Sequence, residues 1–462
     1  MTHLSFLVVT LLSLKVAFGV KYEANWESLD RRPNPEWFDE AKFGIFLHWG
    51  VYSVPSFVDE WFWWFWKGIH QKDIVELMSR YYSPNFSYAD FAKDFRAEFY
   101  DPDKWAEIIE ASGAKYAVLT AKHHEGFCLW PSNHSFNWNS MDVGPKRDLV
   151  GDFVTAMRAR NGNLRVGLYH SLFEWFNPIF LMDKANDYRT RTFVTGKTIP
   201  EMRELVTNYR PDIIWSDGDY GPDSYWNATT FLAWLFNDSP VKDSVAINDR
   251  WCDPCRNKHG GFFTGQDSYN PGKIEPFKWE NCYSIDELSY GYRRNMALKD
   301  VRTATFLIHT LIETVAYGGN FLLNVGPTDS GVIAPIFEAR LREIGRWLAV
   351  NGEAIYSTKP WDTIQRDWTT PSVFYTKGPS KTIYMLITDW PRNAKLYLDG
   401  YLLPQTGRLI ISKGETRPVK IQQNPNNSSQ VVVDLITEDF GLLSPGQLRH
   451  AWVVKFQTIM LA

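Results

Sequence analysis

The sequence has few cysteines, little excess charge and no long apolar run beyond its first residues. Four cysteines occur among 462 residues, and the formal net charge is −4 at pH 7. A chain with this charge has no overall basic field that would attract nucleic acid. After residue 20, no stretch reaches the roughly 18 apolar residues that a membrane-spanning helix needs. Because 44% of the residues are hydrophobic, a disordered chain is excluded as well.

Several common functional motifs are also absent. The chain contains no G-x-S-x-G turn and no Walker loop, so an esterase and a nucleotide-binding enzyme lack support. The pair Cys252-x-x-Cys255 could suggest a zinc or redox site. It lacks a second pair at metal spacing and the strand–helix context of a redox motif. A local disulfide or two free thiols is therefore predicted.

Aromatic side chains are what the sequence has in excess. The 21 Trp, 22 Tyr and 30 Phe make up 16% of the chain. Their flat apolar faces suit stacking on sugar rings, but a well-packed aromatic core would explain the composition equally well. Residues 59–66 read Asp-Glu-Trp-Phe-Trp-Trp-Phe-Trp. We interpret this segment as a loop over a carbohydrate cleft, with a buried hydrophobic plug as the alternative.

The N-terminus predicts a secretory signal peptide over residues 1–19. Residues 4–14 are mostly apolar, small residues follow at Ala17 and Gly19, and Lys21 ends the apolar stretch. We therefore expect a protein of the secretory pathway, either lysosomal or extracellular. In that compartment the N-x-S/T triplets become candidate glycosylation sites. These triplets begin at Asn85, Asn133, Asn227, Asn237, Asn426 and Asn427, of which Asn237 is the weakest because Pro240 follows its Ser239.

Short apolar runs that end in polar residues alternate with helical patterns. Runs of this length suit buried parallel strands, and the alternation predicts a parallel α/β sheet. The absence of a Gly-rich phosphate loop after the first strand favours a (β/α)8-like barrel over a doubly wound sheet. The predicted strands are residues 43–48, 116–124, 165–170, 212–217, 244–250 and 320–325, and the predicted helices are residues 103–111, 149–160, 199–209 and about 335–351.

The texture of the sequence changes after Gly352. Short alternating runs, separated by Gly, Pro and Asn clusters, occur at residues 372–375, 382–387 and 430–433. They predict a small antiparallel β domain. We therefore divide the chain into a signal peptide at 1–19, a catalytic barrel at 20–352 and a C-terminal β domain at 353–462.

The strongest candidate for chemistry is Asp217 in the segment Trp215-Ser216-Asp217-Gly218-Asp219. A carboxylate at a strand end, with Trp215 on the same strand face, can place an acid beside an apolar sugar face. Gly218 allows a sharp turn. The alternative is an aspartate that caps the next helix.

Hydrolysis of a glycosidic bond requires a second carboxyl group. The candidates are Glu280, whose pKa could be raised by desolvation beside Trp279, and Asp267 in Gly265-Gln266-Asp267-Ser268. The sequence does not rank these two residues, because both could lie on a long loop.

Further polar and aromatic residues could bind sugar hydroxyls. His123 and His124 are adjacent on a predicted strand, so we expect their side chains to point to opposite faces and not to share a metal ion. Hydrogen bonding to hydroxyl groups is the better role. The candidates are His48, Glu60, Trp61, His123, His124, Tyr169 and Arg250.

Taken together, these motifs resemble the α-L-fucosidases, the family of retaining glycoside hydrolases that includes the lysosomal enzyme of animals. The resemblance runs in collinear order over about residues 25 to 360. The matching stretches are residues 37–50, 122–127, 142–148, 167–171, 214–218, 248–251, 291–294 and 319–327.

The resemblance implies a (β/α)8-like barrel followed by a C-terminal antiparallel β-sandwich. It implies hydrolysis of terminal α-L-fucose from glycoproteins, glycolipids and oligosaccharides, with Asp217 as the nucleophile. Glu280 matches the position given to the acid/base in animal members, with Asp267 as its rival. The resemblance implies no metal or organic cofactor. It implies a homo-oligomer, such as a tetramer. Fucose-binding positions match His48, Glu60, Trp61, His123, His124, Tyr169, Trp215 and Arg250.

The sequence departs from the family pattern in places, and two other functions compete with this one. Tyr290 stands where the pattern leads us to expect Trp, and the loop at residues 260–278 looks variable. The variable loop leaves the acid/base and the linkage preference open. One competing function is a fucose-binding lectin on an inactive barrel. The other is an exo-glycosidase for a different sugar.

Overall fold

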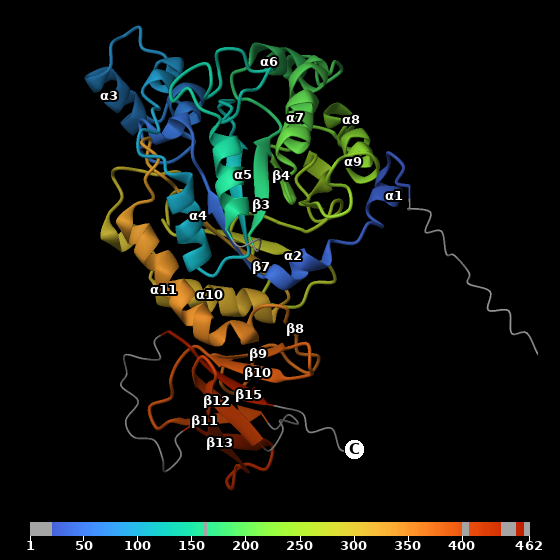
Figure 1. Cartoon of the computed structure of the whole chain (residues 1–462), viewed down its shortest axis with the longest axis vertical. Coiled ribbons are helices and arrows are strands. Elements are labelled where there is room, and N and C mark those ends of the chain that lie inside the picture. Colours follow the sequence, from blue (N-terminus) through green and yellow to red (C-terminus); the bar gives the residue numbers. More distant parts are fainter. Residues whose placement is uncertain (1–20, 161–163, 400–405, 436–449, 457–462) are drawn as a thin grey trace, which may run out of the picture.

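The computed structural model describes residues 21–160, 164–399, 406–435 and 450–456 (Figure 1). The predicted signal peptide lies outside the described residues. Seven parallel strands form one curled sheet, in the order β5-β4-β3-β2-β1-β7-β6. Their bounds are β1 Phe43–Leu47, β2 Tyr116–Lys122, β3 Arg165–Ser171, β4 Ile213–Asp217, β5 Ala246–Ile247, β6 Glu280–Ser284 and β7 Asn320–Val325.

A short extended segment closes this sheet into a barrel. The N–H of Phe262 donates to the carbonyl of Ile247 in β5 at 2.9 Å, and the N–H of Phe263 donates to the carbonyl of Lys278 at 2.8 Å. The N–H of Glu280 in β6 donates back to Phe263 at 2.8 Å. Gly261 permits the close approach, because a Cβ there would lie 2.3 Å from the Ile247 carbonyl oxygen. The segment occupies the place of the eighth strand, so the prediction of a (β/α)8-like barrel is confirmed.

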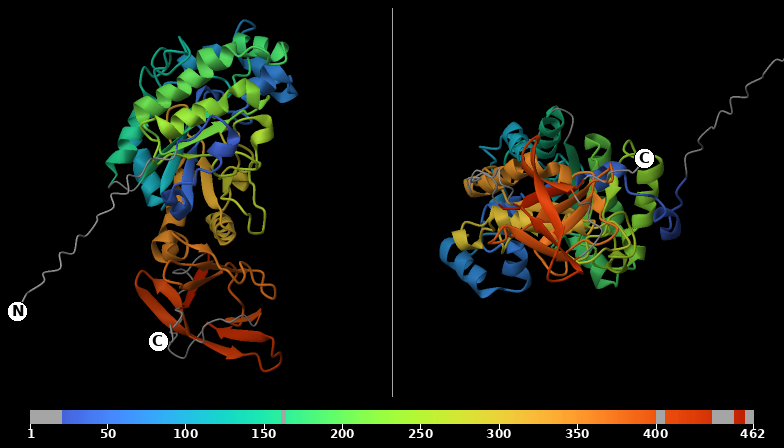
Figure 2. Two further views of the ribbon diagram at one scale, coloured as in Figure 1. Left: turned by 90° about the vertical axis from the view of Figure 1, so that its right-hand side faces the viewer. Right: turned by 90° about the horizontal axis from the view of Figure 1, so that it is seen from below.

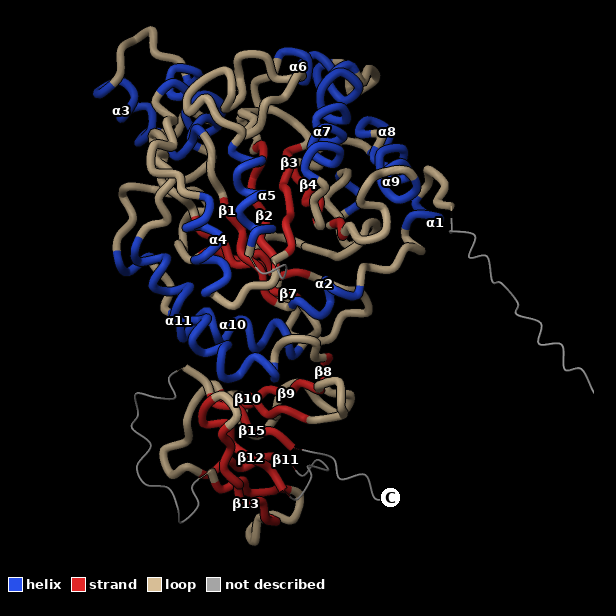
Figure 3. The backbone as a smooth tube through the Cα atoms, viewed as in Figure 1, coloured by secondary structure: helices blue, strands red, loops and turns tan. Residues whose placement is uncertain are grey.

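Helices surround the parallel strands (Figure 3). Several begin at capping residues: Asp101 accepts the N–H of Lys104 at 3.0 Å, and Pro102 occupies the first helical position of α4. The α-helices of this region are α1 Trp26–Leu29, α2 Glu36–Ala41, α3 Lys72–Tyr81, α4 Pro102–Ala111, α5 Leu149–Ala159, α6 Pro178–Ala185, α7 Ile199–Tyr209, α8 Asp223–Trp226, α9 Ala228–Asn237, α10 Ala304–Ala316 and α11 Pro335–Asn351.

Each predicted strand of the barrel is present, but β2 ends at Lys122, β5 spans only Ala246–Ile247, and β6 was not foreseen. Its sequence, Glu-Asn-Cys-Tyr-Ser, is too polar for the apolar pattern of a buried strand. In the structure all residues of β6 except the half-buried Tyr283 are buried. Several of their polar atoms are bonded inside the protein, although Oδ1 of Asn281 has no hydrogen-bond partner among the described residues. The amide of Asn281, for example, donates to the hydroxyl of Thr314 at 3.1 Å. Polar residues can form this buried strand because they bond to residues distant in the sequence. The sequence therefore lacks the apolar pattern that would have identified the strand.

The C-terminal strands form a separate antiparallel sheet. Their order is β11-β14-β13-β12-β15-β10-β9-β8. Side chains from β9 to β15 meet in one apolar core, which includes Tyr375, Met385, Leu398, Leu409 and Val454. The predicted antiparallel β-sandwich is therefore confirmed. The strands are β8 Lys359–Pro360, β9 Val373–Lys377, β10 Ile383–Ile387, β11 Lys395–Asp399, β12 Thr406–Ser412, β13 Glu415–Gln423, β14 Gln430–Asp434 and β15 Trp452–Phe456.

The β-sandwich packs beneath α10 and α11 (Figure 2). The indole N–H of Trp347 in α11 donates to the carbonyl of Ala451 at 2.9 Å, and Phe374 and Val453 join the core of the barrel side. The two parts are thus continuous through an apolar contact. None of the helices in the described ranges has both the length and the apolar character needed to cross a membrane.

Candidate active site

A cavity of about 240 Å³ gathers side chains that follow different strands of the barrel. These side chains therefore lie at the carboxyl ends of the strands, which is where catalytic residues of (β/α)8 barrels lie. All the site residues predicted from the sequence line the cavity except Glu280. They are His48, Glu60, Trp61, His123, His124, Tyr169, Trp215, Asp217, Arg250 and Asp267.

Asp217 is the last residue of β4 and is held by two hydrogen bonds. The hydroxyl of Tyr169 donates to one carboxylate oxygen at 2.9 Å, and Arg250 Nη1 donates to the other at 3.0 Å. Burial opposes the charge of Asp217, but the positive charge of Arg250 lowers its pKa well below the usual value. Gly218, with φ of +72°, turns the chain directly after it. Asp217 is thus an ionised carboxylate at the cavity wall.

Arg250 connects Asp217 to Asp267. Its Nη2 donates to a carboxylate oxygen of Asp267 at 2.6 Å, while its Nε donates to the hydroxyl of Thr264 at 2.9 Å. The Arg250 side chain is 4% exposed, whereas that of Asp267 is 56% exposed. Because one guanidinium holds both carboxyl groups, Asp217 and Asp267 lie close together, with Asp267 on the open side.

Glu280 lies elsewhere, at the start of β6 and therefore at the opposite end of the barrel strands. Its carboxyl group is fully buried and accepts hydrogen bonds from the Tyr116 hydroxyl at 2.5 Å and the Trp215 indole at 3.0 Å. Tyr116 is the first residue of β2, so it too lies at this end. Glu280 supports Trp215 from behind and does not line the cavity.

Burial raises the pKa of Glu280 to about 7, which predicts a pH-dependent stability. A carboxyl group whose pKa is raised on folding contributes stability that is fully present below its unfolded pKa of about 4.3 and is lost as the pH rises through 7. Glu280→Gln should therefore stabilise the protein relative to wild type at pH 8 but not at pH 4.5, by up to about 3 kcal/mol. Urea unfolding of both proteins at the two pH values tests this. Equal differences at both would contradict it.

The expectation that His123 and His124 point to opposite faces is wrong. Strand β2 ends at Lys122, after an irregularity in its pairing with β3, and a turn follows in which the N–H of Gly126 donates to the carbonyl of His123 at 3.0 Å. The two imidazole rings lie 4.1 Å apart, and both line the cavity. The alternation of side chains holds only within a strand, and these residues lie beyond it.

His48 and His124 are neutral hydrogen-bonding groups. Burial lowers the pKa of His48 to about 3 and that of His124 well below its usual value. Nδ1 of His48 lies 2.8 Å from Asn324 Oδ1, and Nδ1 of His124 lies 2.6 Å from the Ser171 hydroxyl, which itself donates to the Phe173 carbonyl. Both Nδ1 atoms are therefore the protonated ones, which leaves each Nε2 as an acceptor.

The Trp-rich segment supplies both a cavity wall and packing. Trp61 lines the cavity, with its ring 5.2 Å from that of Trp175, while Trp63 stacks on Tyr88 at 4.4 Å. Glu60, 7% exposed, accepts the backbone N–H groups of Tyr290 and Gly291 at 3.0 and 2.8 Å. Residues 64–68 form a π-helix and not the predicted loop, and Phe62 and Trp66 are the buried aromatic members of the segment. A role for Trp61 over a carbohydrate stays a prediction.

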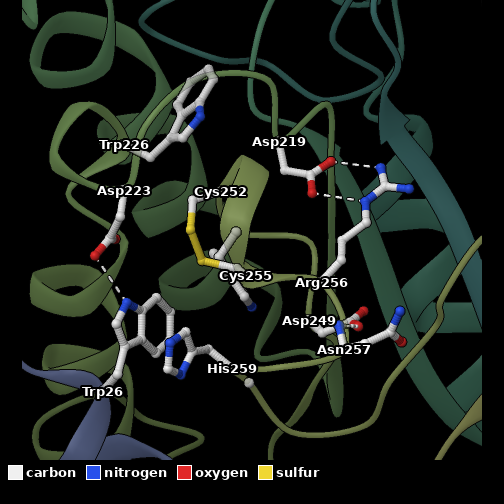
Figure 4. The surroundings of a disulfide bond; sticks show 12 residues. Trp26, Asp219, Asp223, Trp226, Asp249, Cys252, Cys255, Arg256, Asn257 and His259 are labelled. Atoms are coloured by element: carbon white, nitrogen blue, oxygen red, sulfur yellow. Dashed lines mark hydrogen bonds and ion pairs between the residues drawn. A yellow bond between two sulfur atoms is a disulfide. The ribbon is translucent and has the colours of Figure 1, made fainter.

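Arg256 is a cavity residue that the sequence did not reveal. It forms two hydrogen bonds with Asp219, at 2.6 and 2.8 Å, and its Nη2 lies 3.7 Å from Asp217. It directly follows the disulfide between Cys252 and Cys255, which confirms the predicted local pairing (Figure 4). The only sequence signal that could have indicated Arg256 is the cysteine pair that follows closely after Arg250. Other cavity residues that were not predicted to bind the sugar are Phe46, Gly218, Tyr220, Gln266, Cys282 and Tyr290.

The disulfide also bears on the zinc interpretation. Its sulfur atoms and the Asp223 carboxylate lie within 4.8 Å of one another. Two sulfurs bonded to each other offer no thiolate to a metal ion. Asp223 instead accepts the indole N–H of Trp26 at 2.9 Å (Figure 4). The other two cysteines, Cys128 and Cys282, are buried free thiols.

The candidate glycosylation sites differ in access. Asn85, Asn133, Asn426 and Asn427 are exposed, and Asn227 is half-buried. The amide of Asn237 donates to the carbonyls of Tyr22 and Ala233 at 2.8 and 2.7 Å. Ser239 of the same triplet is 2% exposed. Asn237 is therefore engaged in packing, which agrees with its weak ranking, and use of the other sites stays a prediction.

A parallel barrel whose carboxyl edge carries two neighbouring carboxyl groups in an aromatic cavity has the architecture of a glycoside hydrolase. The family model for Alpha-L-fucosidase matches residues 11–353. The chain therefore belongs to the α-L-fucosidase family.

Curated relatives and solved structures agree with this family. The tissue alpha-L-fucosidase of Homo sapiens is 52% identical over 392 residues, which cover 85% of this chain and 83% of that protein. An alpha-L-fucosidase of Branchiostoma floridae is 48% identical over 458 residues, covering 98% of this chain and 100% of that protein. The crystal structure of a Thermotoga maritima alpha-fucosidase in complex with fucose is similar with a TM-score of 0.79. It is 31% identical and covers 94% of this chain and 100% of that chain.

Proposed function

We propose that this α-L-fucosidase removes single terminal α-L-fucose residues from glycans by double displacement, with retention of configuration. The observation that carries the proposal is the single guanidinium of Arg250, which holds both Asp217 and Asp267. Double displacement requires two carboxyl groups about 5–5.5 Å apart. The cavity of about 240 Å³ is smaller than the roughly 300–1,000 Å³ of pockets for drug-sized ligands, which suits one sugar ring.

In the first step, Asp217 attacks the anomeric carbon while the bond to the leaving oxygen breaks. Asp267 donates its proton to that oxygen, and a covalent fucosyl–Asp217 ester forms. In the second step, Asp267 accepts a proton from water, whose oxygen attacks the anomeric carbon and releases Asp217. The lowered pKa of Asp217 keeps the nucleophile ionised at acidic pH.

The remaining residues orient the sugar. The Nε2 atoms of His48 and His124 and the carboxylate of Glu60 accept hydrogen bonds from hydroxyl groups. Trp215 presents the apolar face of its indole to the sugar. The indole N–H of Trp215 donates to the carboxyl group of Glu280 at 3.0 Å, which fixes the ring. We assign Asp267, the exposed carboxyl of the pair, as the acid/base, and Glu280 as a positioning residue for Trp215.

The anomer of the first product tests this proposal. Proton NMR of 4-nitrophenyl α-L-fucoside hydrolysis should show α-L-fucose first, and the β anomer only later by mutarotation. Initial β-L-fucose would indicate inversion and would overturn the double displacement. Fucose binding by folded protein without any product would instead indicate a lectin.

A further inference from the structure

A second cavity, of about 390 Å³, lies beside the first. The two share four lining residues, Glu60, Trp61, Asp267 and Tyr290. The shared residues include Asp267, which we assign as the acid/base. The second cavity therefore adjoins the place where the glycosidic oxygen is protonated.

The position of Asp267 determines what the second cavity can hold. In the proposed function, on which this inference rests, Asp267 protonates the oxygen that joins fucose to the next sugar. When fucose occupies the first cavity, that next sugar must extend past Asp267. We propose that the second cavity binds the leaving sugar, and that its acidic wall selects uncharged leaving sugars over sulfated ones.

The walls of this cavity suit a sugar ring. Trp61, Phe65 and Leu288 supply apolar surface, and Leu288 is 60% exposed. Glu287, whose side chain is 54% exposed, offers a carboxylate to hydroxyl groups. An apolar face with a few polar groups that fix orientation is typical of carbohydrate sites.

The charges of the wall are predominantly negative. Its lining contains Asp59, Glu60, Asp267, Asp286 and Glu287. Neither Asp59 nor Glu60 forms an ion pair within the described part of the chain; Asp59 accepts the N–H of Trp61 at 2.7 Å instead. Burial and the charge of Glu60 raise the pKa of Asp59 to about 8, so Asp59 is uncharged below that pH.

The arginines around the cavity do not neutralise the other carboxylates. Arg250 divides its charge between Asp217 and Asp267, and Arg293 divides its charge between Asp286, at 2.7 Å, and Asp300, at 2.9 Å.

Arg302 is the single arginine in the lining. It packs over the rings of Tyr283 and Phe306 at 4.5 and 4.9 Å, and it lies 3.8 Å from Glu287. An excess of carboxylates therefore remains even with Asp59 and Asp267 protonated, because Glu60, Asp286 and Glu287 outnumber Arg302 in the lining. A sulfate group in this cavity would meet like charge.

The test compares two fucosylated disaccharides that differ only by a sulfate ester on the leaving sugar. We expect kcat/KM to be about tenfold or more lower for the sulfated one, because like charges repel within the low dielectric of a cavity. In Glu287→Lys this ratio should move toward 1. Added salt should reduce the discrimination of the wild type, since it screens the exposed part of the field.

The control for the change of charge is a substitution far from the cavity. Glu415→Lys introduces the same change of charge on β13, in the β-sandwich, and should keep the wild-type ratio. Equal rates for both disaccharides, a preference for the sulfated one, or a Glu287→Lys ratio equal to that of Glu415→Lys would overturn the inference. Failure of the wild type to cleave 4-nitrophenyl α-L-fucoside would instead overturn the proposed function itself.

Discussion

Asp217→Gly is expected to lower kcat on 4-nitrophenyl α-L-fucoside on the order of 10⁴-fold or more, because it removes the atom that forms the covalent intermediate. Glycine also leaves a space at the end of β4 beside Arg250 and Tyr169. Azide can enter this space and attack the anomeric carbon from the side on which the Asp217 carboxylate attacks in the wild type. Added azide should therefore restore nitrophenol release and yield β-fucosyl azide, which NMR identifies.

The matched control for this variant is Asp212→Asn. Asp212 lies just before the same strand, at its other end, where it pairs with Arg165 at 2.9 Å. It should retain near-wild-type activity. Turnover of Asp217→Gly within about tenfold of wild type, with Asp212→Asn also active, would remove Asp217 from the role of nucleophile.

Asp267→Ala should slow the enzyme in a way that depends on the leaving group. Nitrophenolate departs without a proton, whereas the alkoxide of a sugar needs one. We therefore expect a small loss of kcat/KM on the nitrophenyl fucoside and a loss of about 10²–10⁴-fold on a fucosylated disaccharide. Comparing kcat/KM for the two substrates in wild type and variant measures this difference.

Glu280→Gln provides the comparison that distinguishes the two carboxyl groups. Glu280 is fully buried behind Trp215, so its substitution should change kcat/KM by the same factor on both substrates. If Glu280→Gln shows the dependence on leaving group and Asp267→Ala does not, the acid/base role belongs to Glu280. The structure would then have to open at Trp215 during the reaction.

Much of the site could be predicted because the relevant residues follow apolar runs directly. His48 follows β1, Tyr169 lies near the end of β3, and Asp217 ends β4. The order of strands in a barrel brings such ends together whatever the lengths of the connections. Trp215 and Asp217 share a face because side chains alternate along a strand.

Other parts depended on contacts that no local pattern contains. His123 and His124 share the cavity because β2 ends before them, and strand ends are hard to place from sequence. Arg256 reaches Asp217 from a loop closed by the disulfide between Cys252 and Cys255.

By itself, the sequence determined the alternation of strands and helices and the nucleophile candidate, because each depends on residues close together along the chain. It also determined the family, because the family's motifs occur in collinear order along the chain. Only the tertiary structure separated Asp267 from Glu280. Glu280 begins a strand too polar to recognise from the sequence, so its place at the amino end of the barrel strands could not be predicted. Asp267 reaches the cavity because Arg250, 17 residues away, holds its carboxylate. Pairing of this kind depends on how the loops pack, and it cannot be predicted from the periodicity of apolar residues or from the spacing of motifs in the sequence.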